Sequence, residues 1–161
     1  MTAANSVWVF QSVHAVGLSV WCGMAAINNL QAFRGSQGAV GATMSMAPLR
    51  EAPSIATPLL ARAIASSTVH RMALLLVLAL QILATAAGII GSLALITAGG
   101  MATALPWLNL ALSCAAAFLF TMHLGGLWFA YWMRQETLQL THLVLLIWTL
   151  ATFALFNQQW A

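Results

Sequence analysis

The sequence predicts an all-α integral membrane protein, a single domain over residues 1–161 built as a bundle of four transmembrane helices with a long loop between helices one and two. Of its 161 residues, 62% are hydrophobic and 4% are charged, and the mean hydropathy is +0.93. Soluble domains carry about one quarter charged residues, so water could not solvate a surface of this composition. The composition therefore excludes a soluble enzyme and a disordered chain. It also excludes a nucleic-acid-binding protein, because five arginines are too few to follow a phosphate backbone.

Four apolar segments are long enough to cross the hydrocarbon core as helices, which takes about 20 residues each. They are residues 7–33, 69–98, 105–133 and 138–156. Helices are the expected form, because an open strand would leave backbone groups unpaired in lipid. A β-barrel strand alternates polar and apolar residues, and runs such as Met72–Leu80 do not alternate.

The connection between the first two spans, residues 34–68, is predicted to be a long loop. Several glycines and three prolines interrupt it, namely Pro48, Pro53 and Pro58. Its later part, residues 55–65, is largely apolar and is expected to lie along the membrane interface as a short helix. The loop is therefore expected on the surface of the bilayer and not across it.

The other two connections, residues 97–104 and 134–137, are predicted to be short turns. Pro106 suits the first turn of the third helix, where a missing N–H leaves no hydrogen bond unmade. All five arginines lie in or beside the first and third connections: Arg34, Arg50, Arg62, Arg71 and Arg134. The positive-inside rule then places loops 34–68 and 134–137 in the cytoplasm and both termini outside.

Small residues recur on one face of each of the first two spans, at four-residue spacing. They are Ala15, Ser19 and Gly23 in the first span and Ala84, Gly88 and Ser92 in the second. Such faces let helix backbones approach closely in lipid. They favour packing within the chain, with contact to a partner subunit or no role as the alternatives.

The third span contains two adjacent glycines, Gly125 and Gly126. Glycine inside a helix costs about 1 kcal/mol relative to alanine, so its presence calls for a compensating close approach. In lipid that neighbour is expected to be another helix or a flat ligand. Substituting Gly126 with leucine is therefore expected to disrupt assembly more than Leu127→Ala does.

Three short motifs carry a family resemblance. They are Asn28-Asn29, then Arg62-Ala63-Ile64 followed by Ser66 and His70, then Gly125-Gly126-Leu127-Trp128-Phe129 followed by Trp132. Their order and spacing resemble the bacterial predicted small integral membrane proteins, a four-helix family of unknown function. The resemblance runs from about Asn28 to the C-terminus. It implies the four-helix architecture and supplies no activity.

The chain also departs from the pattern of that family. The family usually has a glutamate where this chain has Leu127, and another in the second helix near the position of Gln81. The aspartate that normally follows the loop methionine is absent after Met44 and Met46. The resemblance thus argues against a carboxylate-based mechanism in this chain.

Four histidines, one per span, are the remaining ionisable groups of interest: His14, His70, His123 and His142. Depth arguments pair His14 with His123 near the middle of the bilayer, and His70 with His142 near the inner interface. Either pair is a candidate for axial ligation of haem b, with Gly17 and Gly126 leaving room for a porphyrin. The alternative is that these side chains hydrogen-bond neighbouring helices or meet interfacial water.

Arg62 and Arg71 are expected to meet anionic lipid headgroups. The chain has no Ser-His-Asp set, metal-binding helix motif or phosphate loop.

These features favour a small non-catalytic accessory or anchor subunit of a larger bacterial inner-membrane assembly, of respiratory or other electron-transfer type. The alternative is a b-type haem-binding or quinone-site subunit that uses one of the histidine pairs. The expected partners are the lipid bilayer and other membrane subunits, with no nucleic acid.

Overall fold

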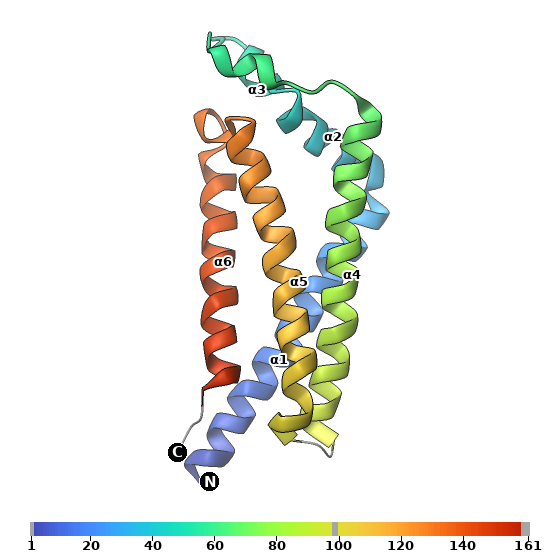
Figure 1. Ribbon diagram of the computed structural model, residues 1–161, viewed down its shortest axis with the longest axis vertical. Helices are drawn as coiled ribbons and strands as arrows, with labels where there is room; N and C mark the ends of the chain where they lie inside the picture. Colours follow the sequence, from blue (N-terminus) through green and yellow to red (C-terminus); the bar gives the residue numbers. More distant parts are fainter. Residues whose placement is uncertain (1, 98–99, 159–161) are drawn as a thin grey trace.

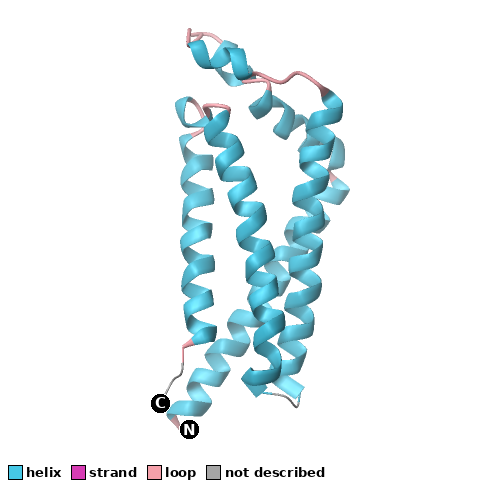
Figure 2. Cartoon of the chain, viewed as in Figure 1, coloured by secondary structure: helices cyan, strands magenta, loops and turns pink. Residues whose placement is uncertain are grey.

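The computed structural model describes residues 2–97 and 100–158, and the elements within those ranges are helices. Four of them are long and apolar enough to cross a membrane: α1 (Ala3–Gln31), α4 (Ser67–Thr97), α5 (Gly100–Trp128) and α6 (Glu136–Asn157). They form an elongated bundle in which the start of α1 and the end of α6 lie at the same end (Figure 1). Figure 2 shows that the described chain is almost entirely helical. The predicted all-α membrane architecture is confirmed.

The predicted boundaries hold to within a few residues except in the third span. There the helix runs from Gly100 to Trp128 instead of from residue 105 to residue 133. Pro106 consequently lies inside α5, where it removes one intrahelical hydrogen bond, and not in its first turn. The helix ends early because Ala130 adopts a left-handed conformation with φ of 55°. The predicted last residue of the second span, Ala98, lies outside the described residues.

The predicted long loop at residues 34–68 is wrong. After α1 ends, α2 (Phe33–Met44) begins almost at once, with Ala32 as the cap between them. Residues 33–44 contain no proline, and the glycine at position 41 is used for packing, since a Cβ there would lie 2.7 Å from Nδ1 of His70. Glycine thus permits a close helix–helix contact here instead of breaking the helix.

Beyond α2 the chain is irregular, as the prolines predict. A short helix α3 (Ala47–Arg50) follows Met46, whose φ is 53°. The apolar stretch predicted as an interfacial helix at residues 55–65 contains only one 3₁₀ turn, η1 (Pro58–Arg62). Together α2, α3 and η1 form a cap over one end of the bundle (Figure 1).

Small residues set the contact between α1 and α4. Oγ of Ser19 lies 3.2 Å from Oγ of Ser92, and a Cβ on Gly88 would lie 2.6 Å from Oγ and 3.4 Å from Cα of Ser19. A Cβ on Gly23 would lie 3.3 Å from the Thr85 methyl group. The other two small residues predicted for these faces, Ala15 and Ala84, are fully buried. Close approach in lipid rests on such side chains, because burying apolar surface gains little there.

The cap is fixed to the turn that joins α5 and α6. Met46 and Leu49 from the cap form an apolar cluster with Phe129 and Ala130 from the turn. The guanidinium of Arg134 donates to the Pro53 carbonyl across the same contact. These contacts therefore hold the cap against this end of the bundle.

Candidate functional site

The turn between α5 and α6 places one aromatic ring beneath the cap. After α5 ends at Trp128, the left-handed Ala130 reverses the chain into the 3₁₀ turn η2 (Tyr131–Met133). The ring of Tyr131 then lies against Gly126, where an added Cβ would approach Cε2 of the ring to 2.6 Å. Glycine is required at this position because the aromatic ring occupies the space of a side chain. The close approach predicted for Gly126 is thus made by the chain's own next turn.

Tyr131 connects two of the four histidines. Its Oη and Nδ1 of His123 are 2.8 Å apart in a hydrogen bond. Burial raises the pKa of the Tyr131 phenol, so the hydroxyl stays protonated at neutral pH and can donate. Its ring also stacks on that of His142, with centroids 6.0 Å apart and planes at 20°. The rings of His123 and His142 meet edge to face at 6.5 Å, so three rings from three elements form one cluster.

His142 is the least satisfied member of this cluster. Its side chain is 7% exposed, and Nδ1 is buried with no hydrogen-bond partner within the described part of the chain. A buried polar group without a partner costs about 1–3 kcal/mol. His142 therefore has an unused capacity to bind a polar atom.

A cavity of about 390 Å³ lies beside this cluster, beneath α2. It is bounded by the second and third turns of α4, the first two turns of α6, the last turns of α5, the end of α1, and α2. Its lining is mainly apolar, with Met44, Leu74, Val77, Met122, Phe129 and Leu138 among the larger side chains. His142, Tyr131 and the two glycines Gly125 and Gly126 also reach it. The lining is thus mainly apolar, and it also includes polar side chains from α1, α2, α5, η2 and α6, namely Asn29, Ser36, Thr43, Thr121, Tyr131 and His142.

The two glycines differ in what surrounds them. Gly126 is pressed against Tyr131, whereas a Cβ on Gly125 would meet nothing within 4 Å. Gly125 therefore leaves open space where Gly126 leaves none. The two glycines are adjacent in the sequence, but in the structure Gly126 is packed against a ring and Gly125 is not.

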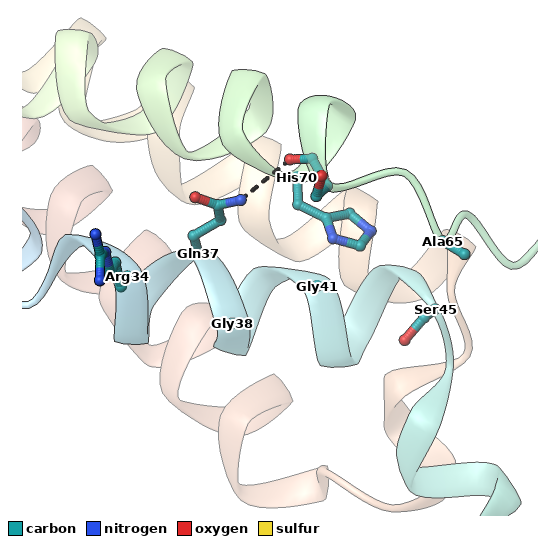
Figure 3. Close-up of a pocket in the computed structure, with 8 residues that line it drawn as sticks. Arg34, Gln37, Gly38, Gly41, Ser45, Ala65 and His70 are labelled. Atoms are coloured by element: carbon teal, nitrogen blue, oxygen red, sulfur yellow. Dashed lines mark hydrogen bonds between the residues drawn. The ribbon is translucent and has the colours of Figure 1, made fainter.

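A second, more polar groove lies on another side of α2, against the start of α4 (Figure 3). Gln37 Nε2 donates to the Ser67 carbonyl at 3.1 Å across it. His70 is buried here, and its Nε2 lies 2.8 Å from the Ile64 carbonyl oxygen. Arg34 stands at one edge of the groove (Figure 3). His70 thus has a structural partner in the chain connection that precedes α4.

The structure does not bring the predicted histidine pairs together. His70 lines the polar groove and His142 the apolar cavity. His14 bonds within its own helix, with Nδ1 3.0 Å from the Phe10 carbonyl oxygen, and packs on the Phe10 ring. It lies 17 residues before the cap end of α1, about 26 Å at 1.5 Å per residue, whereas His123 is five residues from the cap end of α5. The observed neighbours are His123 and His142.

The surroundings of His123 do not fit a porphyrin. The space expected beside Gly126 is filled by the Tyr131 ring, which also holds Nδ1 of His123. A haem would have to displace this ring. The structure therefore supports no step through haem b.

The two arginines expected at lipid headgroups differ in their contacts. Arg62 places its guanidinium 4.5 Å from the centroid of the Trp128 ring, a cation–π contact, and donates to the Trp128 carbonyl. Arg71 is exposed at the start of the second turn of α4. Arg62 thus attaches the cap to the end of α5, and both arginines are exposed.

Two features of the site were not found from the sequence. One is the role of Tyr131, the chain's only tyrosine, which follows the glycine pair by five residues. The other is the contact between Asn29 of α1 and Gln81 of α4, whose side chains share a 2.9 Å hydrogen bond. Gln81 thus has a structural partner in α1.

One family model matches most of the chain. The family model described as "Predicted small integral membrane protein (DUF2165)" matches residues 7–159, nearly the whole chain. No curated protein and no solved structure matches the chain.

Proposed function

Because the chain belongs to the family of predicted small integral membrane proteins, we propose that it is a non-catalytic accessory subunit of a larger bacterial inner-membrane assembly, of electron-transfer type. The observation that carries the proposal is the open face of α6. Within the most apolar 18 residues of α6, only 17% are buried by the rest of the chain. The corresponding share is 39% for α4 and for α5. α6 is therefore the spanning helix of which the rest of the chain covers the smallest share, and its open face is available to another membrane subunit.

The uncovered face of α6 is continuous. Leu140, Val144, Ile147 and Leu150 follow one another at intervals of three and four residues, and each is more than half exposed. In lipid, a helix face of this kind can pack against a second helix by van der Waals contact. We call these four residues the α6 face.

Native electrophoresis of gently solubilised membranes tests the proposal. The chain is expected to migrate with at least one other subunit at a fixed ratio. The double substitution Ile147→Ala and Leu150→Ala should release it as a free chain, because it removes the packing surface of the α6 face. The matched control is Leu76→Ala with Leu83→Ala on exposed positions of α4, which should leave the assembly intact. Migration of the unaltered chain only as a free monomer would contradict the proposal.

The proposed orientation places the cap in the cytoplasm, because all five arginines lie at that end of the bundle. Ser54 is exposed within the cap, and Ala102 is exposed at the opposite end, in the first turn of α5. Ser54→Cys should resist an impermeant maleimide in intact cells and react after permeabilisation, whereas Ala102→Cys should react in both. The native Cys22 and Cys114 are buried and should give little background. Labelling of Ser54→Cys in intact cells would reverse the orientation.

A further inference from the structure

The cavity beneath α2 has the size and lining of a small-molecule site. Its volume of about 390 Å³ falls in the usual range for ligand pockets, about 300–1,000 Å³. The lining is mainly apolar and contains no arginine, aspartate or glutamate among the described residues. A charged ligand would lose its hydration there without gaining a counter-ion. The cavity therefore favours a neutral ligand with an apolar body.

One side chain in the cavity indicates what polar atom that ligand carries. His142 lines the cavity, is 7% exposed, and has no partner for its buried Nδ1 within the described ranges. A neutral imidazole can donate one hydrogen bond and accept one. Nδ1 has almost no accessible surface, so a ligand reaches the His142 ring at its other nitrogen, Nε2. A carbonyl or hydroxyl oxygen can form a hydrogen bond there, whereas a plain acyl chain cannot.

The His142 ring is also held in place. Tyr131 stacks on it at 6.0 Å, and Tyr131 is itself fixed by its hydrogen bond to His123 and by its contact with Gly126. Holding the polar group before the ligand arrives lowers the entropy cost of binding. The other open part of the cavity is at Gly125, where an added Cβ would have no atom within 4 Å. A flat ring can use this space.

We propose that this cavity binds the ring of a neutral, bilayer-soluble quinone, with a ring oxygen hydrogen-bonded to His142. The apolar lining holds the ring, and the position of the cavity at the end of the spanning helices lets an apolar tail remain in the bilayer. The inference concerns the isolated chain and does not depend on any partner subunit. It also uses neither of the histidine pairs expected from the sequence.

A titration followed by the histidine side-chain NMR signals tests this inference on the purified full-length chain in detergent. The probe is 2-decyl-1,4-benzoquinone, and the comparator is decylbenzene, which has the same tail and a ring without oxygen. The quinone should shift the His142 signal saturably and leave that of His14 unchanged. Decylbenzene should bind about tenfold more weakly, because it lacks one hydrogen bond to a buried group.

Two variants separate the polar and steric parts of the site. His142→Phe should reduce quinone affinity about tenfold, to that of decylbenzene, measured by competition between the two compounds. Gly125→Leu should abolish binding of the quinone and of decylbenzene, because its side chain fills the cavity. This variant keeps His142, so the His142 NMR signal can still be followed. The control Gly17→Leu also places a side chain where no atom lies within 4 Å, but outside the cavity, and should bind normally.

The outcomes distinguish the possible occupants. Equal binding of quinone and decylbenzene would overturn the proposal in favour of a hydrocarbon-filled cavity. Absence of a saturable His142 shift with the quinone would overturn it as well, and so would unaltered quinone binding in Gly125→Leu. Because the titration uses the purified chain alone, a negative result would not bear on the proposed accessory role, which native electrophoresis tests separately.

Discussion

Gly126→Leu is expected to lower the free energy of unfolding by about 1–3 kcal/mol, the usual cost of forcing extra atoms into a packed site. The reason is the ring of Tyr131, whose Cε2, Cδ2 and Cζ atoms would all lie within 2.8 Å of the new Cβ. The ring must leave its position, which breaks its hydrogen bond to His123 and its stacking on His142. The substitution thus dismantles the aromatic cluster as well as the packing of the turn.

The neighbouring glycine provides a control with the opposite expected sign. Gly125→Ala meets no atom within 4 Å and should raise stability by up to about 1 kcal/mol, because alanine favours the helical state. Reversible unfolding in mixed detergent micelles measures both changes. The histidine NMR signals should move for His123 and His142 in Gly126→Leu and stay close to those of the native chain in Gly125→Ala. Similar destabilisation by the two substitutions would mean that Tyr131 does not occupy the position described.

Gly88→Leu is the second substitution expected to have a large effect, through the contact between α1 and α4. An added Cβ would lie 2.6 Å from Oγ and 3.4 Å from the backbone Cα of Ser19. A side chain can rotate away, but a helix backbone can move only with its whole helix. Separation of α1 from α4 should therefore cost about 1–3 kcal/mol or more.

The matched control for this contact is Ser92→Ala. It removes the 3.2 Å hydrogen bond to Ser19 without adding bulk, and Ser19 keeps its bond to the Ala15 carbonyl at 2.8 Å. Hydrogen bonds between membrane helices contribute about 0.6 kcal/mol on average, so the loss should be small. Unfolding in detergent compares the two variants. Equal losses of stability would show that the hydrogen bond, and not backbone proximity, holds α1 to α4.

The quinone site and the open α6 face lie on different parts of the bundle. His142 faces the cavity from the first two turns of α6, while Ile147 and Leu150 are exposed further along the same helix. A partner could thus cover the α6 face without filling the cavity. The two experiments are accordingly independent.

The depth of the histidines shows how a small boundary error changes a functional hypothesis. The sequence places the end of the third helix at Met133, and the structure ends it at Trp128. Five residues correspond to about 7.5 Å along a helix, enough to move His123 from the bilayer middle to the level of His142. The cause is the left-handed Ala130, a conformation that no local signal in an apolar segment reveals.

The sequence alone determined that the chain is a helical membrane protein with four spans, because the length and apolarity of each segment leave no other stable form in lipid. It also indicated which small residues bring α1 and α4 together. Only the tertiary structure decided that residues 33–44 form a helix, that Tyr131 fills the space at Gly126, and that His142 lines a cavity. These facts depend on contacts between residues far apart in the chain. Whether a glycine breaks a helix or admits a neighbour is determined by what lies opposite it, and not by its own sequence context.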